Sequence, residues 1–213
     1  MALEATHLRF ALDLKDLCDV QDLSRFLFGT IYPDSRYLTK VDRTLTHPKD
    51  GLDWDLAHLD DFRKGWYLHL LCDKIQREIM KEWIPSAFEG DTTQGGEVWI
   101  NHTALKIIQE IDDLLRFDIS AVLPLLDHVE NPNGEDLETL TRYNQLFLRI
   151  YANPLQMSFE SYRPLLKEFG VEEELAQRVK QQTFAYRQNL ETINKIKHIY
   201  STMLSRAKKR FTT

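Results

Sequence analysis

The stretch that decides the fold covers residues 59–83 and reads LDDFRKGWYLHLLCDKIQREIMKEW. Its apolar residues recur at spacings of three and four, the period of an α-helix with one buried face. His69 and Asp73 stand four residues apart in this run, so a helix places both on the same face. An ionised carboxylate is costly to bury and needs a partner, often a cation. A metal ion would satisfy the carboxylate and the imidazole together.

The composition is that of an ordinary globular protein. The chain has 213 residues, 43% of them hydrophobic and 28% charged, with a formal net charge of −6. This length suffices for one substantial core, and we expect a single all-α domain over residues 1–213. The net charge does not indicate a nucleic-acid partner, although it leaves one possible. Residues 1–20 contain no clean apolar signal-peptide core, and no window resembles a transmembrane helix, which predicts a cytoplasmic location.

Helical spacing also dominates the rest of the chain, in which glycine and proline number only eight and seven. No convincing run alternates in the manner of a strand, so we expect seven or eight helices. Cys18 and Cys72 form no CxxC motif and are expected to be small buried residues. The other expected helices cover about 3–17, 20–29, 98–115, 118–128, 135–151, 154–169 and 171–213, the second stopped by Gly29 and the last broken near Gln181–Thr183. Residues 29–37, 39–54 and 89–96 are expected to be loops.

Further metal-ligand types precede the central helix: His7, Asp34 and His47. Each has a simpler interpretation. His7 lies on an apolar stripe and could be a core histidine, Asp34 follows Pro33 and could form a turn, and His47 could lie on the surface. Together with His69 and Asp73, however, they supply the mixed nitrogen and oxygen ligands that suit zinc or another divalent metal. An aspartate can also bridge two ions ~4 Å apart, the arrangement of two-metal phosphoester hydrolysis.

The motifs resemble those of the zinc-dependent phospholipase C / S1–P1 nuclease superfamily, mainly its intracellular bacterial members. The resemblance covers about residues 5–75 and rests on THLRFA, FLFGTIYPDSRY, LTHP and FRKGWYLHLLCDK. Gly29 with Asp34, and Gly65 with His69, reproduce the family's glycine spacings. The resemblance implies an all-α bundle that holds its metals between helices. It also implies a hydrolase, such as a phosphodiesterase, that attacks a phosphoester with a metal-activated water.

Position by position, the resemblance assigns Asp34, His47, His69 and Asp73 to a central metal site. It assigns His7, together with Asp73, to a second ion.

The chain departs from the family at a third ion, whose ligands there include a later histidine and a His-x-x-x-Glu helix. Here His102 is the candidate ligand, but Lys106 stands where the glutamate is expected. Glu110, Asp112 and Asp113 are weak substitutes. We therefore expect one or two zinc ions rather than a complete three-metal centre.

Asp34 and Arg36 are the expected catalytic residues, because an arginine two residues from a ligand can bind phosphate. A solvated surface arginine is the alternative for Arg36. The expected substrate is a phospholipid, a nucleotide or another small phosphoester.

Two other functions compete with this hypothesis. One is a helical binding or scaffold protein whose metal site is structural or degenerate. The other is an HD-type phosphohydrolase, which requires an adjacent His-Asp pair; this chain has only the reversed pair Asp127-His128. The sequence leaves the oligomeric state open.

Overall fold

The computed structural model describes residues 3–211, and all regular secondary structure in this part of the chain is helical. Over these residues it contains ten α-helices and no β-strand, so the all-α prediction is confirmed and the expected count of seven or eight is too low. The α-helices are α1 (Glu4–Leu14), α2 (Leu23–Ile31), α3 (Arg36–Thr39), α4 (Arg43–Thr46), α5 (Asp61–Trp83), α6 (Glu97–Leu114), α7 (Leu137–Ile150), α8 (Phe159–Glu168), α9 (Glu173–Gln188) and α10 (Leu190–Phe211).

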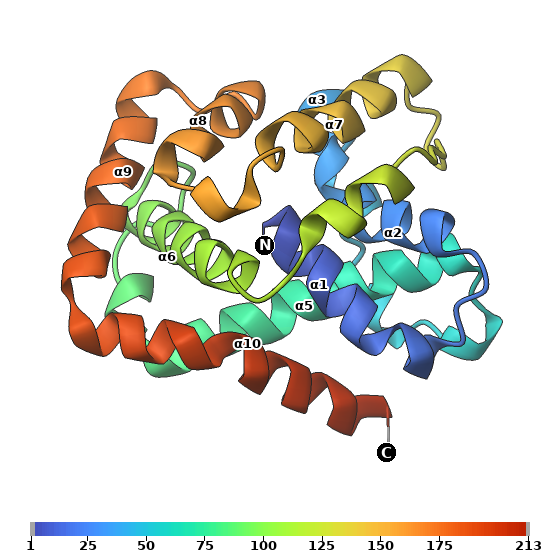
Figure 1. Ribbon diagram of the computed structural model, residues 1–213, viewed down its shortest axis with the longest axis horizontal. Coiled ribbons are helices and arrows are strands. Elements are labelled where there is room, and N and C mark those ends of the chain that lie inside the picture. The colour runs from blue at the N-terminus through green and yellow to red at the C-terminus, as the bar shows by residue number, and fades with distance from the viewer. Residues whose placement is uncertain (1–2, 212–213) are drawn as a thin grey trace.

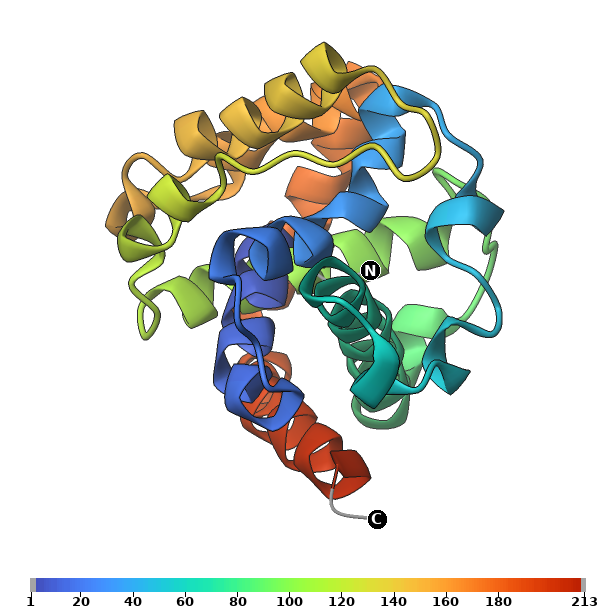
Figure 2. The same ribbon diagram turned by 90° about the vertical axis from the view of Figure 1, so that its right-hand side faces the viewer.

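The central helix is α5, which packs against α1, α2 and α10 (Figure 1). In Figure 1, α9 and α10 frame the left and lower edges, while α7 and α8 cover the upper side. The view turned by 90° shows α7 and α8 as a layer above α1, α2 and α5 (Figure 2). Helix α6 packs against α9 and α10 and also contacts α1. As the apolar spacing predicts, α5 buries one face, including Leu68, Leu71 and Ile79.

Two glycines bring the backbones of α2 and α5 into direct contact. A Cβ atom at Gly29 would lie 1.9 Å from the carbonyl oxygen of Phe62, and one at Gly65 would lie 2.0 Å from that of Phe26. Only glycine permits this approach. The prediction that Gly29 ends the second helix is therefore wrong, because Gly29 lies inside α2 and serves a tertiary contact.

Two of the expected loops are partly helical. The segment expected as a loop over 29–37 contains the end of α2, the 3-10 helix η2 (Tyr32–Ser35) and the start of α3. Pro33 lies in the first turn of η2, where a backbone N–H has no partner within the helix, so the N–H that proline lacks costs no hydrogen bond. Residues 39–54 include α4 and the 3-10 helix η3 (Gly51–Asp53), whereas residues 89–96 have no regular element, as expected.

Two other boundaries differ from the prediction. The C-terminal segment breaks at Asn189, not near 181–183, because Asn189 is extended and its side chain accepts a hydrogen bond from the Thr192 N–H at 3.0 Å. Asp118 is a helix cap, as expected, and accepts from the Ser120 N–H at 3.1 Å. The helix expected there is instead two 3-10 turns, η6 (Ile119–Ala121) and η7 (Leu123–Leu125).

Cys18 and Cys72 are free and buried, as the sequence predicts. Among the helices between residues 3 and 211, none combines the length and the apolar character needed to cross a membrane.

Candidate metal centre

Helix α5 presents His69 and Asp73 to the interior one turn apart. Asp60 caps its first turn by accepting a hydrogen bond from the Arg63 N–H at 2.9 Å. The His69 ring is fully buried, and its Nε2 atom lies 3.6 Å from Oδ2 of Asp73. Asp73 is the more accessible of the two, with a side chain 13% exposed. The structure thus confirms that the pair shares one helix face.

A backbone carbonyl fixes the orientation of His69. Its Nδ1 atom lies 2.9 Å from the carbonyl oxygen of Thr30 in α2, an acceptor that requires a proton on Nδ1. The lone pair of the neutral ring is then on Nε2, which faces Asp73 and His47. A histidine that ligates a metal is usually held by such a hydrogen bond from its other nitrogen. The glycine-mediated contact of α2 with α5 places Thr30 where it can accept this bond.

Asp34 enters the centre from the turn after α2. Its side chain is 3% exposed, and Oδ1 lies 3.9 Å from Nε2 of His47. Within residues 3–211, this buried oxygen accepts no hydrogen bond. A buried carboxylate oxygen without a donor is costly and indicates a missing positive group.

His47 completes the central group from the end of α4. Its Nε2 atom lies 3.3 Å from Nε2 of His69 and 3.7 Å from Oδ2 of Asp73. The Trp66 indole N–H donates to the Thr46 carbonyl oxygen at 2.7 Å, which attaches the segment before His47 to α5. The surface interpretation of His47 is therefore wrong, since its side chain is only 6% exposed.

His7 approaches the other carboxylate oxygen of Asp73. Its ring stacks on His69 with the centroids 3.9 Å apart, and its Nε2 atom lies 3.4 Å from Oδ1 of Asp73. Neither nitrogen of this buried ring has a well-formed hydrogen bond to another described residue. The two oxygens of Asp73 thus face different histidines, the arrangement needed for a carboxylate that bridges two ions.

The separations of these atoms match the size of a metal site. Two groups of potential ligands lie with their atoms within 4.8 Å of one another: His47, His69 and Asp73, and His7, Asp34 and His69. A tetrahedral zinc site with bonds of ~2.0–2.1 Å separates its ligand atoms by about 3.4 Å. The measured separations in the first group, 3.3, 3.6 and 3.7 Å, are close to that value.

The protonation states of His69 and Asp73 are those that metal binding requires. Burial lowers the pKa of His69 well below its usual value, and the neighbouring His7 lowers it further. Burial acts to raise the pKa of Asp73, yet nearby positive charge, followed by its contacts with His47, His69 and His7, holds that pKa well below the usual range. Neutral histidine and ionised aspartate are the forms that bind a metal.

Glu4 is a buried carboxyl group that the sequence analysis missed. It lies one turn before His7 in α1 and is 1% exposed. Burial raises the pKa of Glu4 well above its usual value, and the charges of Asp34 and Glu110 raise it further. Its spacing of three from His7 is the signal that could have identified it.

His102 is not part of either ligand group. It lies in α6 with its ring centroid 5.2 Å from that of Phe88, and its buried Nε2 atom has no hydrogen-bond partner among the described residues. Four residues later, the side chain of Lys106 is also buried. Burial lowers the pKa of Lys106, whereas the charges of Asp73 and Asp34 oppose this shift.

Arg36 lies in α3 with its Cζ atom 4.1 Å from the centre of the Tyr37 ring. Tyr37 in turn stacks on Phe169, with the centroids 4.5 Å apart. The guanidinium group is therefore held against an anchored aromatic ring next to the turn that carries Asp34. This placement departs from that of a freely solvated arginine.

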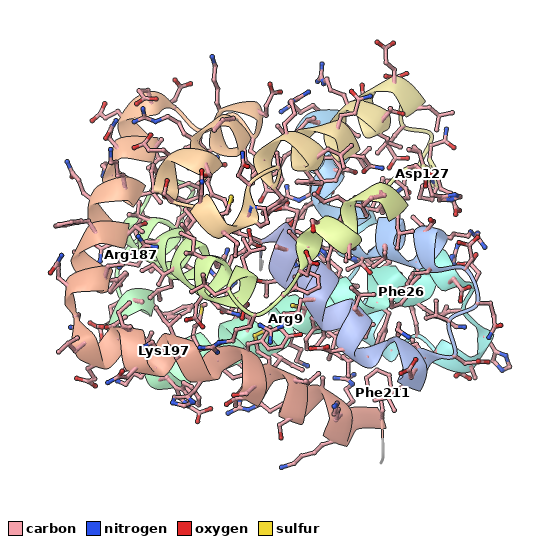
Figure 3. All side chains as sticks on the ribbon, viewed as in Figure 1. Arg9, Phe26, Asp127, Arg187, Lys197 and Phe211 are labelled. Carbon is pink, nitrogen blue, oxygen red and sulfur yellow. The ribbon has the colours of Figure 1, made fainter. Side chains whose placement is uncertain are left out.

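One face of α6 is polar and buried, which is unusual for a helix in a globular protein. Glu110 accepts hydrogen bonds from the Thr6 N–H at 3.0 Å and the Tyr151 hydroxyl at 2.6 Å. Asp113 pairs with Arg9 at 2.9 Å, and Figure 3 shows Arg9 between α1 and α6. Burial raises the pKa of Glu110 to about 7 and that of Asp113 to about 6. The recurrence of polar residues at helical spacing, from His102 to Asp113, is the signal for this face.

No protein-family model, curated protein or solved structure matches the chain. The functional argument therefore rests on the geometry and charge of the centre.

Proposed function

We propose that this protein is a metal-dependent phosphoester hydrolase of the phospholipase C / P1 nuclease type. The observation that carries the proposal is the convergence of His47, His69 and Asp73, whose ligand atoms are 3.3–3.7 Å apart. The buried Oδ1 atom of Asp34, which accepts no hydrogen bond from the described residues, faces the same group. These buried atoms come from η2, the end of α4 and α5, and a divalent cation would satisfy them together.

The central ion would be held by Asp34, His47, His69 and Asp73. His7 and the second oxygen of Asp73 would contribute to another ion. Zinc suits this mixture of imidazole and carboxylate ligands. When bound, it would generate a nucleophile from water near neutral pH and polarise the phosphoryl group.

The chain's own groups would orient the reaction. Thr30 holds the His69 tautomer, and the Asp34 oxygen that does not bind the ion would accept the proton of the attacking water. Arg36, oriented by its stacking on Tyr37, would bind a phosphate oxygen. The substrate would be a nucleotide, a phospholipid or another small phosphoester, encountered in the cytoplasm.

The proposal is tested by comparing Asp73→Asn with Asp127→Asn, in which the exchanged aspartate lies on the outer surface (Figure 3). Metal per chain is measured by mass spectrometry on untagged protein purified without chelators, and hydrolysis is measured on chromogenic phosphomonoesters and phosphodiesters. We expect wild type and Asp127→Asn to contain zinc and hydrolyse a phosphoester, and Asp73→Asn to lose both properties. Absence of metal from the wild type after zinc addition would contradict the proposal.

A structural metal site in a helical binding protein is the second candidate. It is favoured by the burial of the centre, in which even Asp73 is only 13% exposed. A hollow of about 720 Å³, lined in part by the apolar Leu115, Phe117 and Leu155, lies away from the ligands and offers a binding surface. This function predicts that Asp73→Asn lowers metal content and melting temperature while no variant, including the wild type, hydrolyses a phosphoester.

A further inference from the structure

Positive charge is concentrated along one edge of the molecule, in the second half of α9 and in α10. Residues 178–211, which we call the basic edge, contain nine lysines and arginines and one acidic residue, Glu191, a net charge of +8. Because the whole chain has a net charge of −6, the other residues together carry −14. The basic edge follows the left and lower sides of Figure 1 and bends at Asn189. Such an asymmetric charge distribution orients a protein near a charged surface.

The helix macrodipole accounts for only part of this positive charge. It favours cations in the last turn of a helix, where α9 carries Arg187 and α10 carries Lys208, Lys209 and Arg210. The other five cations of the basic edge lie outside these two turns. Ion pairs with carboxylates account for some of the five, as in Lys180–Glu160, Lys195–Glu191 and Arg206–Glu82.

Arg187 and Lys197 are open to a partner outside the chain. Both are exposed, and within residues 3–211 neither side chain forms a hydrogen bond or an ion pair. Figure 3 labels Arg187 on α9 and Lys197 on α10, on the two sides of the bend. An anionic partner at the bend can therefore contact both cations without breaking an ion pair of the protein.

Two large apolar side chains are exposed beside these cations. Phe184, one turn before the end of α9, is 65% exposed, and Leu190, the first residue of α10, is 78% exposed. Arg187 follows Phe184 by three residues, so the two share a face of α9. Lys197 follows Leu190 by seven residues, or two turns, and shares its face of α10. Each exposed apolar side chain thus has a cation on the same helix face.

The same face of α10 continues towards the end of the helix. Lys208 follows Lys197 by eleven residues, close to three full turns, so the two lysines lie on one side. Around Lys208 is a hollow of about 450 Å³, lined by Ser201, Leu204, Ser205, Lys208 and Lys209. Because all of these residues belong to one helix, the hollow is open to the outside. The Ser205 hydroxyl and the two ammonium groups are donors that suit a phosphate.

We propose that the basic edge binds the surface of a membrane that contains anionic phospholipids. Arg187, Lys197 and Lys208 lie among the headgroups, where cations are attracted to an anionic leaflet. Phe184 and Leu190 enter the boundary between the headgroups and the acyl chains, as the apolar residues of interfacial proteins do. The acidic remainder of the molecule faces away from the surface, because like charges repel it.

The exposed residues favour a lipid surface over a nucleic acid. Bases stack on aromatic rings, which would use Phe184 but leaves the exposed Leu190 without a role. A membrane interface uses both side chains together with the cations. The basic edge contains none of the candidate metal ligands, so this inference does not depend on the proposed function.

The test measures binding of the whole protein to sucrose-loaded vesicles by co-sedimentation. One set of vesicles contains phosphatidylcholine alone, and the other also contains phosphatidylserine. Two double variants change the basic edge: Arg187→Gln with Lys197→Gln, and Phe184→Ser with Leu190→Ser. All four positions are exposed, so the exchanges leave the core unchanged, and circular dichroism verifies the fold.

Matched double variants elsewhere on the molecule are the controls. Arg142→Gln with Arg149→Gln removes two exposed cations from α7, which lies on the upper side of Figure 1. Leu115→Ser with Leu155→Ser removes two apolar side chains that are 64% and 78% exposed, close to the values for Phe184 and Leu190.

We expect wild type and both controls to bind vesicles with phosphatidylserine about tenfold or more tightly than neutral vesicles, and added salt to release them. The loss of Arg187 and Lys197 should weaken this binding by about thirtyfold, or about fivefold for each cation. The loss of Phe184 and Leu190 should weaken it by about tenfold or more. Asp73→Asn should bind vesicles as wild type does, whether or not the metal centre is active.

Three results would overturn the inference. Wild type could bind neither set of vesicles. The variants of the basic edge could bind vesicles with phosphatidylserine as tightly as their controls, which would place the binding surface elsewhere. Wild type could also bind a single-stranded oligonucleotide but no vesicles, which would make the partner of the basic edge a nucleic acid.

Discussion

The metal centre and the Glu110–Asp113 face of α6 both bury carboxylates, but they satisfy them differently. Glu110 receives hydrogen bonds from the Thr6 N–H and the Tyr151 hydroxyl, and Asp113 receives one from Arg9. In the metal centre, Oδ1 of Asp34 has no donor in the described part of the chain, and the neutral His69 offers a lone pair instead of a proton. The carboxylates of the α6 face are satisfied by protein donors, whereas the candidate metal centre leaves a buried carboxylate oxygen without a donor in the described part of the chain.

The largest expected effect is stabilisation by metal. A ligand present at about 1,000 times its Kd stabilises the folded protein by about 4 kcal/mol. For a chain of this size, that corresponds to a rise in Tm of about 10 °C. Differential scanning calorimetry of chelator-treated protein with and without zinc measures the shift.

Asp73→Asn is the control, and its Tm should not respond to zinc. An equal shift in wild type and variant would mean that zinc binds elsewhere. The candidate metal centre would then differ from the α6 face in no need for a cation.

Gly65→Ala should break the metal centre and leave the α6 face intact. Its Cβ would lie 2.0 Å from the Phe26 carbonyl oxygen, so α5 must shift relative to α2, at a cost of about 3 kcal/mol. This shift separates His69 from Thr30 and Asp34. Urea denaturation should show the loss of stability, and the folded variant should bind zinc weakly. Arg63→Ala, at an exposed position of the same helix, should change neither property.

Glu110→Gln gives the smallest expected effect and tests the α6 face. The pKa of Glu110 is raised by burial from 4.5 to about 7 in the folded protein. The folded state therefore binds this proton more tightly than the unfolded state, and its stability falls as pH rises from 4.5 through about 7. Glutamine cannot ionise, so the variant should be more stable than wild type by about 2 kcal/mol near pH 8.

The advantage should vanish below pH 4.5, where Glu110 is protonated in both states. Urea denaturation across this pH range measures the difference. A variant that is less stable than wild type at every pH would show that the ionised Glu110 is favoured where it lies.

Local pattern was sufficient to predict α5 and the shared face of His69 and Asp73. The period of the apolar residues determines which side of a helix is buried, and the spacing of four residues places His69 and Asp73 on the same side. Asp34 and His47 were recognised as possible ligands from their residue types, but only the motif resemblance assigned them to the central site. Their burial depends on the turn after α2 and on the Trp66–Thr46 bond, which join segments distant in sequence.

Other features depended on tertiary contacts that no local pattern contains. Gly29 read as a helix stop because its partner, Phe62, is 33 positions away in the chain. The burial of Glu4 and Lys106 was not predicted, because charged residues are rarely buried and no local pattern marks these two as exceptions. The groups that act on their charge, such as Asp34 and Asp73, come from other elements of the fold.

The central claim is that a metal ion binds between α2, α4 and α5. Crystals of the protein grown with zinc and measured at the zinc absorption edge test it most directly. We predict an anomalous peak within bonding distance of Nε2 of His47, Nε2 of His69 and Oδ2 of Asp73. A crystal with no peak there, or with zinc only at surface pairs such as His128 and Glu130, would contradict the claim.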